Sequence, residues 1–371
     1  MIDVGLLGQL VPGPAVTDGV RCLAANNNLD VTRWKDRVWL AWRTAPTHFA
    51  SADARIEVVS APASGSLVEA AWRHETTLAL GADLRECRFV VWNGRLLLYA
   101  MELGTHPLRF EPRRTHLLIN DGAGFGSPQV VWESATVPWR PRVIDGRLVF
   151  FVYTGADKLY SPRPEPTTVE VWTSEDGIGW TPMHPAIHHG GTEFDAAELD
   201  DGSLLGVTRL EGPRHWGSSI LRGRLDKLGS WTERHDDRKF DSPNVFRAGD
   251  RVLMLARRHT RSGGAFDRGW SWMAPSLRTR AYQGVYSATR KRSALWELDP
   301  DRLDATWLAD LPSRGDTSFG AVLPRDDRSF TVFDYTSPLD GPDPSWIRGQ
   351  LRPTVIVASD ISLGDDSLGD S

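Results

Sequence analysis

The stretch GTEFDAAELDDGSLLGVTR, at positions 191–209, places two acids before one apolar run and an arginine after the next. Glu193 and Asp195 open the first run, Asp201-Gly202 marks a turn, and Arg209 ends the second run. Two strands joined by such a turn are antiparallel, so the start of one lies beside the end of the other. A carboxylate beside an arginine can bind polar groups and transfer protons, or it can form a structural ion pair.

Charged side chains occur at the equivalent place, just ahead of an apolar run, in five further segments. They are Asp30, Glu86 with Arg88, Arg140 with Arg142, Asp241, and Asp316. If these segments surround one channel, the arginines bind anionic or hydroxyl-rich groups and the carboxylates supply an acid and a base. Roughly a quarter of the residues in soluble proteins are charged, so a coincidence of surface charges is the competing interpretation.

Two histidines, His188 and His189, directly precede this stretch in MHPAIHHGG. Either one can carry a proton or bind a hydroxyl group if it reaches the same channel. His184 and His188 have the spacing of metal ligands on a helix, but Pro182 and Pro185 disfavour a helix there. We therefore expect no metal and no cofactor.

Six segments share one layout, in which a tight polar turn separates two apolar runs. Their ranges are 29–45, 87–102, 140–155, 194–211, 242–259 and 318–337. Asn93-Gly94 and Asp145-Gly146 are strong hairpin signals, because both central residues of a type I′ turn need positive φ. The nearly regular spacing of the turns and the near absence of helical periodicity are typical of propeller blades. The sequence therefore predicts an all-β, six-bladed β-propeller.

The segment TSEDGIGW, with Ser174, Asp176, Gly177 and Trp180, resembles the Asp-box of sialidases and related propellers. The Asp-box pattern is S-x-D-x-G-x-x-W, and this copy has one residue fewer before the tryptophan. In that family the aspartate holds a hairpin turn and the tryptophan packs beneath it. The resemblance implies a sialidase-like propeller and a structural role for the motif.

The stretch from Glu193 to Arg209 also resembles a sialidase segment, in which a catalytic glutamate starts a strand and an arginine ends the return strand. The resemblance implies that Glu193 tunes a nucleophile or acts as acid or base, and that Arg209 holds a carboxylate. Other parts of the sialidase pattern are missing. NNNLD at 26–30 replaces an R-I-P motif, RGDTSF at 314–319 lacks the nucleophilic tyrosine, and Tyr335 lies on the following strand. Sialic acid hydrolysis by that mechanism is therefore disfavoured.

The predicted function is hydrolysis of a small polar or anionic glycoside by carboxylates in the central funnel. An inverting glycosidase holds two carboxyl groups roughly 6.5–9.5 Å apart, one as acid and one to activate water. We assign Glu193 as the acid and Asp30 as the base, with Asp316 as the substitute if Asp30 faces away. Substrate binding is assigned to the other funnel candidates, which are Arg88, Arg140, Arg142, Arg209, Glu86, Asp195, Asp241, His188 and His189.

Two other functions would use the same funnel. A lyase, cyclase or isomerase would transfer protons with these carboxylates, His188 or His189, and a tyrosine beneath an apolar lid. A non-catalytic binding propeller would present aromatic residues at the mouth and neutralise every charge in the funnel. Two acids that face each other with room for a sugar would favour the glycosidase.

We expect residues 1–360 to form one propeller domain, closed by a C-terminal strand at 353–359 that pairs within the first blade's sheet. The insertion at 262–292 holds the best helix candidate, from about Pro275 to Thr289, and forms either a lid over the mouth or a loop on the rim. Residues 361–371 are acidic and are predicted to be disordered.

The chain has 371 residues, 40% of them hydrophobic and 25% charged, which is typical of a soluble globular protein. Its net charge of −5 argues against nucleic-acid binding, and it has no apolar run long enough to cross a bilayer. The N-terminal MIDVGLLGQLVPGPAV lacks a secretion signal, so we expect a cytoplasmic protein in which Cys22 and Cys87 are thiols. The expected partner is a small-molecule or oligosaccharide substrate, with no nucleic acid and no membrane.

Overall fold

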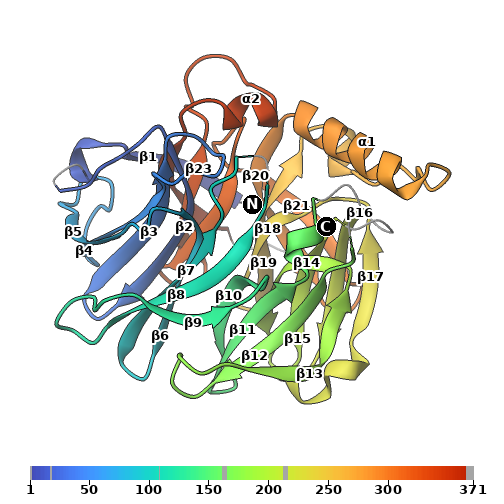
Figure 1. Cartoon of the computed structure of the whole chain (residues 1–371), viewed down its shortest axis with the longest axis horizontal. Coiled ribbons are helices and arrows are strands. Elements are labelled where there is room, and N and C mark those ends of the chain that lie inside the picture. Colours follow the sequence, from blue (N-terminus) through green and yellow to red (C-terminus); the bar gives the residue numbers. More distant parts are fainter. Residues whose placement is uncertain (1, 17–18, 108, 161–164, 212–215, 365–371) are drawn as a thin grey trace, which may run out of the picture.

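The structure is a computed structural model that describes residues 2–16, 19–107, 109–160, 165–211 and 216–364. Within these ranges the strands form six four-stranded antiparallel sheets. The first strand of each sheet contacts the first strands of two neighbouring sheets, so six inner strands close a ring. Figure 1 shows the resulting blades, which confirm the predicted all-β, six-bladed β-propeller.

Blades 1 to 3 follow the chain order from the inner strand outward. Blade 1 contains β2 (Ala25–Trp34), β3 (Arg37–Ala45), β4 (Arg55–Pro62) and β5 (Arg73–Leu78). Blade 2 contains β6 (Asp83–Trp92), β7 (Arg95–Leu103), β8 (Pro112–Asn120) and β9 (Gln129–Glu133). Blade 3 contains β10 (Val137–Ile144), β11 (Arg147–Thr154), β12 (Thr168–Ser174) and β13 (Thr181–His189).

Blades 4 and 5 have the same order, whereas blade 6 takes its outer strand from the other end of the chain. Blade 4 contains β14 (Gly191–Glu198), β15 (Leu204–Glu211), β16 (Trp216–Gly223) and β17 (Thr232–Asp236). Blade 5 contains β18 (Asp241–Ala248), β19 (Arg251–His259), β20 (Lys291–Asp299) and β21 (Asp304–Asp310). Blade 6 contains β22 (Ser318–Pro324), β23 (Ser329–Thr336), β24 (Val355–Leu363) and β1 (Ile2–Val11).

The six predicted turns all join the first and second strands of a blade. Asn93 and Gly94 have φ values of 49° and 74°, and Asp145 and Gly146 have 48° and 67°. Two consecutive positive φ angles match the right-handed twist of the flanking strands, which is why these residue types direct a tight hairpin. The local sequence thus determines the inner half of each blade.

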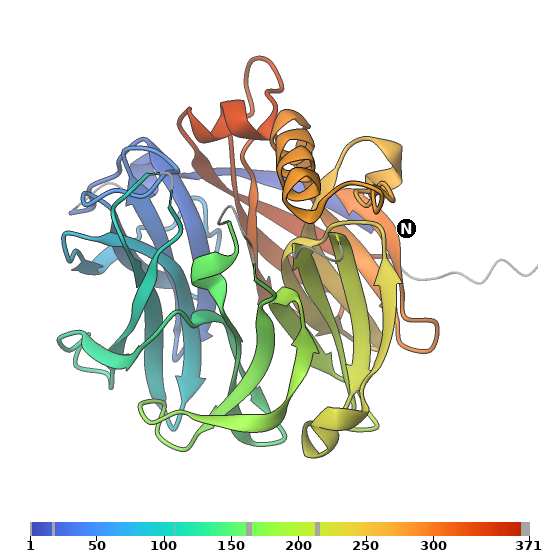
Figure 2. The ribbon, with the colours of Figure 1, turned by 45° about the vertical axis from the view of Figure 1, so that its right-hand side comes forward.

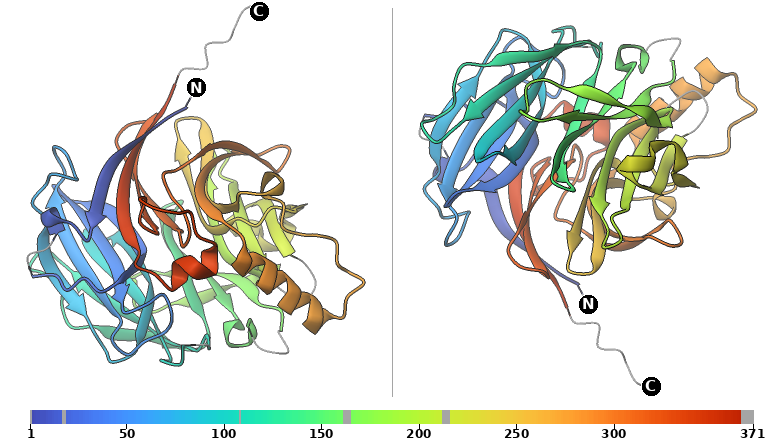
Figure 3. Two further views of the ribbon diagram at one scale, coloured as in Figure 1. Left: turned by 90° about the horizontal axis from the view of Figure 1, so that it is seen from above. Right: turned by 90° about the horizontal axis from the view of Figure 1, so that it is seen from below.

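The ring closes differently from our prediction. We expected residues 353–359 to pair within blade 1, but β24 pairs with β23 and with β1 in blade 6. Figure 3 shows β1 and β24 side by side. Residues 361–363 belong to β24, so the predicted disorder is wrong for them, and residues 365–371 of the predicted tail lie outside the described residues.

The turn between β12 and β13 holds the segment that resembles an Asp-box. Asp176 Oδ1 accepts the backbone N–H groups of Ile178 at 2.8 Å and Gly179 at 2.9 Å. Trp180 packs edge-on against Tyr99 of blade 2, with ring centroids 5.9 Å apart. The segment therefore fixes a tight turn and joins blade 3 to blade 2.

Five inner strands carry a left-handed residue near their start, with φ between 47° and 57°. These residues are Asn28, Glu86, Glu193, Ser242 and Phe319. Each lies where the register between the first and second strands of its blade shifts. Such a β-bulge places two residues opposite one and re-aims a side chain. A left-handed non-glycine residue costs roughly 1–3 kcal/mol, so its recurrence around the ring marks these five positions as candidates for a functional site.

Two helices lie at one end of the ring, as Figures 1 and 2 show. Helix α1 (Pro275–Ala288) occurs in the insertion at the predicted place, between β19 and β20, and α2 (Trp346–Gln350) lies between β23 and β24. Among the described residues, no helix is long and apolar enough to span a membrane. The described ranges also contain short 3-10 segments at Pro14–Val16, Ala156–Lys158, Leu225–Ser230 and Ser262–Gly264.

Candidate active site

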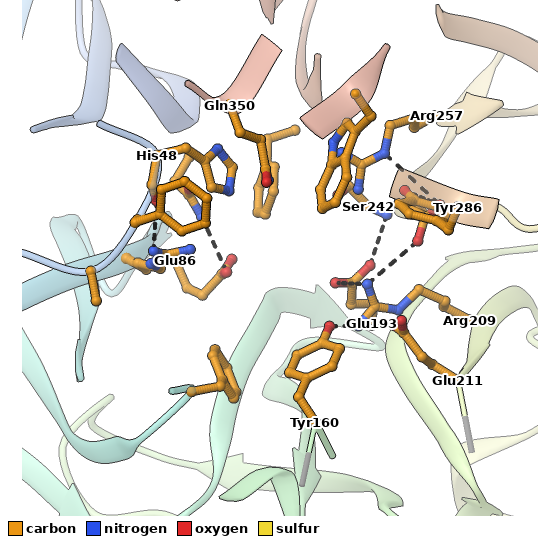
Figure 4. Close-up of a pocket in the computed structure, with 18 of the residues that line it drawn as sticks. His48, Glu86, Tyr160, Glu193, Arg209, Glu211, Ser242, Arg257, Tyr286 and Gln350 are labelled. Atoms are coloured by element: carbon orange, nitrogen blue, oxygen red, sulfur yellow. Dashed lines mark hydrogen bonds and ion pairs between the residues drawn. The ribbon is translucent and has the colours of Figure 1, made fainter. Parts of the chain in front are cut away.

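A cavity of about 400 Å³ opens where the inner strands begin. All six blades contribute to its lining, from three kinds of position. These are the bulges of the inner strands, the ends of the second strands, and the loops and helices at that end of the ring. Figure 4 shows the labelled side chains arranged around this hollow.

All five left-handed bulge residues line the cavity. Two of them, Glu86 and Glu193, are acids that we singled out from the sequence. Regular alternation would not distinguish these positions from the residue two places later on the same face. The bulge makes the distinction, because it turns one particular side chain of each strand into the cavity.

Glu86 lies on the blade 2 wall and is buried. Its Oε1 accepts a hydrogen bond from Asn28 Nδ2 at 3.2 Å, and its Oε2 accepts one from Arg88 Nη2 at 3.0 Å. Arg88 lies behind Glu86 and is not part of the cavity lining. Burial raises the pKa of Glu86 to about 7, against the effect of Arg88 and with a contribution from the charge of Glu193. A buried carboxyl group of this kind can donate a proton near neutral pH.

Glu193 lies on the opposite wall of the cavity in Figure 4. Its Oε1 is 2.9 Å from Arg209 Nη1, and its Oε2 accepts the backbone N–H of Ser242 at 2.8 Å. The predicted contact between Glu193 and Arg209 is therefore present. Burial raises the pKa of Glu193, whereas Arg209 and the Ser242 N–H favour its ionised form. These two donors also fix the direction of the carboxylate.

Asp241, which also lines the cavity, is neutralised by several cations. It lies 3.4 Å from Arg209 Nη1 and 3.5 Å from Lys239 Nζ, and it accepts a hydrogen bond from Tyr286 OH at 2.9 Å. Burial opposes ionisation, but Lys239, Arg257 and Arg209 together hold the pKa of Asp241 well below its usual range. Asp241 is thus a fixed negative charge in the wall.

The ends of the second strands supply Arg209, which we predicted from the sequence, Arg257, which we missed, and Tyr335, to which we gave no role. Arg209, Arg257 and Tyr335 each pair with the residue that directly precedes the bulge, in blades 4, 5 and 6. All three line the cavity. Our sequence analysis compared the starts of the first strands of the blades. The same comparison at the ends of the second strands would have identified Arg257 and Tyr335 as candidates for the cavity wall.

Glu211 is another missed acid, two residues after Arg209 on the same strand face. It lies 3.3 Å from Arg209 Nη2 and 3.2 Å from Lys239 Nζ. Tyr160 OH donates a hydrogen bond to it at 3.3 Å. The two cations therefore bridge Glu211 to the rest of the blade 4 and blade 5 wall.

Asp316 does not line the cavity, but it lies directly behind His48, which does. Asp316 Oδ2 is 2.6 Å from His48 Nδ1, and Asp316 Oδ1 accepts a hydrogen bond from Tyr335 OH at 3.1 Å. The predicted substitute base therefore does not face the cavity directly and contacts His48 instead. His48 follows β3 in a loop, outside the repeated hairpin pattern, so the repeat gave no signal for it.

Asp30, Arg140, Arg142 and Asp195 lie deeper in the ring and do not line the cavity. Arg142 donates two hydrogen bonds to Asp195, at 2.5 Å and 3.0 Å, while Asp30 lies 3.4 Å from Arg140. Asp30, Arg140 and Arg142 border a separate hollow nearer the hairpin turns. Asp30 therefore does not face Glu193 across the cavity, and we correct its assignment as the base and that of the other three as substrate-binding residues.

His188 and His189 lie on β13, the outer strand of blade 3, and do not line the cavity. His188 Nε2 is 3.1 Å from Glu233 Oε1 of blade 4, and His189 Nδ1 is 3.4 Å from Thr168 Oγ1. An outer strand lies far from the propeller axis, even when the next inner strand follows directly in sequence. Their assignment to the funnel is therefore corrected.

Both helices contribute to the cavity wall. Gln283, Tyr286 and Ser287 come from α1, and Trp346 and Gln350 come from α2. The insertion at 262–292 thus borders the site, and its function as a lid stays a prediction.

The charges of the cavity lining balance. Five acids line it, namely Asp83, Glu86, Glu193, Glu211 and Asp241, and so do five cations, namely Arg85, Arg109, Arg209, Lys239 and Arg257. The tyrosine, tryptophan and phenylalanine rings among the lining residues add apolar faces. Such a wall suits a polar molecule with many hydroxyl groups.

Comparison with known proteins supports the fold. A protein of unknown function from Dyadobacter fermentans superimposes with a TM-score of 0.63 at 14% identity, over 97% of this chain and 99% of its own. Trypanosoma rangeli sialidase in complex with sialic acid superimposes with a TM-score of 0.61 at 13% identity. That match covers 98% of this chain and 59% of the sialidase chain. A Hadza microbial sialidase gives a TM-score of 0.55 at 14% identity, over 91% of this chain and 66% of its own.

No protein-family model matches the chain, and no curated protein matches its sequence. At identities of 13–14% the structural matches bear on the fold alone. The fold is that of a sialidase-like six-bladed β-propeller, with a polar cavity on the end of the ring where the inner strands start.

Proposed function

We propose that this protein hydrolyses the glycosidic bond of a small polar glycoside in the cavity. Glu86 is the proton donor and Glu193 is the opposing carboxylate. Arg209, Arg257 and the ring of Trp346 contact the substrate.

The observation that carries the proposal is the position of two buried carboxyl groups, Glu86 and Glu193, on opposite walls of one cavity (Figure 4). They come from blades 2 and 4, so the ring itself sets their separation. Glycosidases need two carboxyl groups with room between them for a sugar and different protonation at neutral pH.

The environments of the two groups favour different roles. Glu86 has a pKa of about 7 and therefore keeps its proton on many molecules at neutral pH. Arg209 Nη1 and the backbone N–H of Ser242 both contact Glu193 and favour its carboxylate form, against burial and the charge of Asp241, which raise its pKa. A carboxylate offers about four acceptor positions, so Glu193 can still bind a water molecule. This order reverses our sequence-based choice of Glu193 as the acid.

In the proposed reaction Glu86 gives its proton to the leaving oxygen as the glycosidic C–O bond breaks. Glu193 takes a proton from the water molecule whose oxygen bonds to the anomeric carbon. Each product carries one new hydroxyl group, and the proton on Glu193 returns to Glu86 through solvent. Attack from the wall opposite the acid inverts the anomeric configuration.

The cavity and its charges support a small, polar substrate. A volume of about 400 Å³ falls in the range of small-molecule sites and leaves no room for a long polysaccharide. The equal numbers of acids and cations favour hydroxyl groups over a multiply charged ligand.

The test is hydrolysis of a panel of 4-nitrophenyl pyranosides, furanosides and uronides by the purified protein. Glu86→Gln and Glu193→Gln should each lower kcat by about 100-fold or more. Glu102→Gln is the matched control, because Glu102 is a buried acid that pairs with His116 at 2.7 Å outside the cavity. Silence of the folded wild type across the panel, or full activity of both cavity variants, would reject the proposal.

A further inference from the structure

We propose that His48, held by Asp316, is a second proton acceptor of the cavity and gives the protein an eliminase activity. In this activity His48 removes a carbon-bound proton next to a carboxylate, and Glu86 protonates the departing sugar oxygen. The proposal takes the donor role of Glu86 from the hydrolysis proposed above. Its base and its products are different.

The contact between His48 and Asp316 determines which imidazole nitrogen carries the hydrogen. Asp316 is fully buried, and its Oδ2 lies 2.6 Å from His48 Nδ1. An ionised carboxylate only accepts hydrogen bonds, so Nδ1 is the donor and Nε2 keeps its lone pair. Asn27 Nδ2 lies 3.4 Å from the same nitrogen, which is a much longer contact. Asp316 thus selects the tautomer in which Nε2 is the base.

Asp316 is itself held in place from two sides. Tyr335 OH donates to its Oδ1 at 3.1 Å, and its backbone N–H donates to Ser337 Oγ at 3.1 Å. These contacts keep the carboxylate aimed at His48. The same carboxylate then stabilises the imidazolium that forms when Nε2 takes a proton, as in other aspartate–histidine pairs.

The free nitrogen of His48 is accessible from the cavity. His48 lines the cavity, and 14% of its side chain is exposed. Within the described part of the chain, every hydrogen bond of His48's ring involves Nδ1. Burial lowers the pKa of His48, and the nearby Arg85 and Arg43 lower it further, against the charge of Asp316. The ring edge of Trp346 packs on it from α2, with centroids 6.4 Å apart.

The position of His48 relative to Glu86 suits elimination better than hydrolysis. His48 belongs to blade 1 and Glu86 to the adjacent blade 2, and Figure 4 shows both on the wall that faces Glu193. A base and an acid on the same side of a sugar ring can remove a proton and assist a leaving group on the same face. This is the geometry of a syn elimination.

Elimination also needs a cation for the charge that develops on the substrate carboxylate. Arg257 lines the cavity, and its Nη1 donates to the backbone oxygen of Thr317 at 3.2 Å. Its Nε is buried and lies 3.9 Å from Asp241 Oδ2. A substrate carboxylate beside the part of the guanidinium that lines the cavity would stabilise the enolate-like charge.

The step balances without water. His48 Nε2 takes the proton from the carbon next to the carboxylate, and the electron pair of that C–H bond becomes a carbon–carbon double bond. The neighbouring C–O bond breaks, its electron pair stays on the oxygen, and that oxygen receives the proton of Glu86. The products are an unsaturated acid and a free hydroxyl group. The proton on His48 then returns to Glu86 through solvent.

The substrate class follows from this chemistry. It is a uronic acid with a second sugar on its C4 oxygen, because C4 is bonded directly to C5, the carbon that carries the carboxyl group and loses the proton. The probe is a disaccharide with a single carboxylate, in which the C1 of a glucose is joined to the C4 oxygen of a glucuronic acid. In glucuronic acid the C5 hydrogen and the C4 oxygen lie on the same face of the ring, as a syn elimination requires. Elimination gives an unsaturated product that absorbs ultraviolet light, whereas hydrolysis in ¹⁸O-labelled water gives two saturated sugars and incorporates the label.

The experiment measures both products from this probe with the wild type, His48→Gln, Asp316→Asn and Glu193→Gln. The ratio of elimination to hydrolysis should fall at least 10-fold in His48→Gln and Asp316→Asn, and rise in Glu193→Gln. His116→Gln is the matched control, since His116 also pairs with a buried acid, Glu102, but lies outside the cavity. It should leave the ratio unchanged.

A second measurement is independent of turnover. The ¹⁵N NMR shifts of His48 in the wild type at pH 7 should show hydrogen on Nδ1 and none on Nε2, and Asp316→Asn should shift this population. Hydrolysis without unsaturated product, or a hydrogen on Nε2, would overturn the eliminase proposal alone. Elimination without hydrolysis would overturn only the proposed hydrolysis, and a wild type that forms neither product would overturn both.

Discussion

The ring holds two levels of charged residues that differ little in composition and greatly in environment. The upper level lines the cavity and includes Glu86 and Glu193. The lower level is the set Asp30, Arg140, Arg142, Asp195 and Asn244, which meets inside the ring below it. Neighbouring members of the two levels lie two residues apart on the same inner strand.

The acids of the lower level are hydrogen-bonded within the ring, whereas the buried Nε of Arg140 has no hydrogen-bond partner among the described residues. Asp195 accepts hydrogen bonds from Arg142 and from the backbone N–H of Val245, and Asp30 accepts the backbone N–H of Phe89. These contacts join neighbouring blades across the ring. In the upper level, by contrast, Glu86 has a raised pKa, and His48 Nε2 has no hydrogen-bond partner among the described residues. Similar residue types therefore build a structural plug at one depth and a candidate site at the next.

The largest expected effect separates the two levels by turnover. Glu193→Gln should lower kcat by about 10²–10⁴-fold, because it removes a group that acts on the reacting atoms. Asp30→Asn should leave kcat per folded molecule within about three-fold, since Asp30 lies outside the cavity. Kinetics on the best glycoside from the panel measure both. An equal loss in the two variants would place Asp30 in the chemistry after all.

The second effect is on the free energy of unfolding, and here a substitution in the lower level has the large effect. Asp195→Ala leaves Arg142 and Arg140 without their shared acid, and breaking such a buried pair costs about 3–5 kcal/mol of the free energy of unfolding. Urea unfolding measures this loss. Arg247→Ala is the control, because its partner Asp200 is exposed and such pairs contribute about 1 kcal/mol or less. Similar losses in both variants would contradict a structural plug.

The third effect is the pH dependence of stability that comes from Glu86. Its folded-state pKa of about 7 lies above the usual value of 4.5 for a glutamate, so the folded protein binds more protons between these values. The contribution of Glu86 to stability is therefore complete below about pH 4.5 and is lost as the pH rises through 7. Glu86→Gln cannot lose this contribution, because glutamine does not ionise. The free energy of unfolding of the variant, relative to that of the wild type, should therefore rise by up to about 3 kcal/mol from pH 4 to pH 8. Thermal or urea unfolding at both pH values measures the gain, and a pH-independent difference would refute the raised pKa.

The smallest effect concerns the insertion. Tyr286→Phe removes the hydrogen bond from α1 to Asp241 and should cost about 1–3 kcal/mol. Hydrogen exchange along α1 should then increase, while the plug residues stay protected. Unchanged exchange on α1 would show that this contact does not hold the helix against the cavity.

Local sequence determined the elements that depend on near neighbours. The Asn-Gly and Asp-Gly turns and the alternating runs around them predicted the inner hairpins, and the repeated layout predicted six blades. The hairpin between Glu193 and Arg209 placed these two residues side by side, because a short antiparallel connection leaves few alternatives. The helix in the insertion was also predicted, at about Pro275 to Thr289, and α1 spans Pro275–Ala288.

Only the tertiary structure decided which charged residues meet in the cavity. Alternation treats Glu193 and Asp195 as equivalent, and the bulge that separates them depends on register with the second strand. His48 lies in an unrepeated loop and gains its partner Asp316 from the last blade, far away in sequence. The closing strand β1 likewise pairs with β24 across the length of the chain. Each of these contacts is non-local, so its free energy is gained only when the ring closes and no short stretch of sequence encodes it.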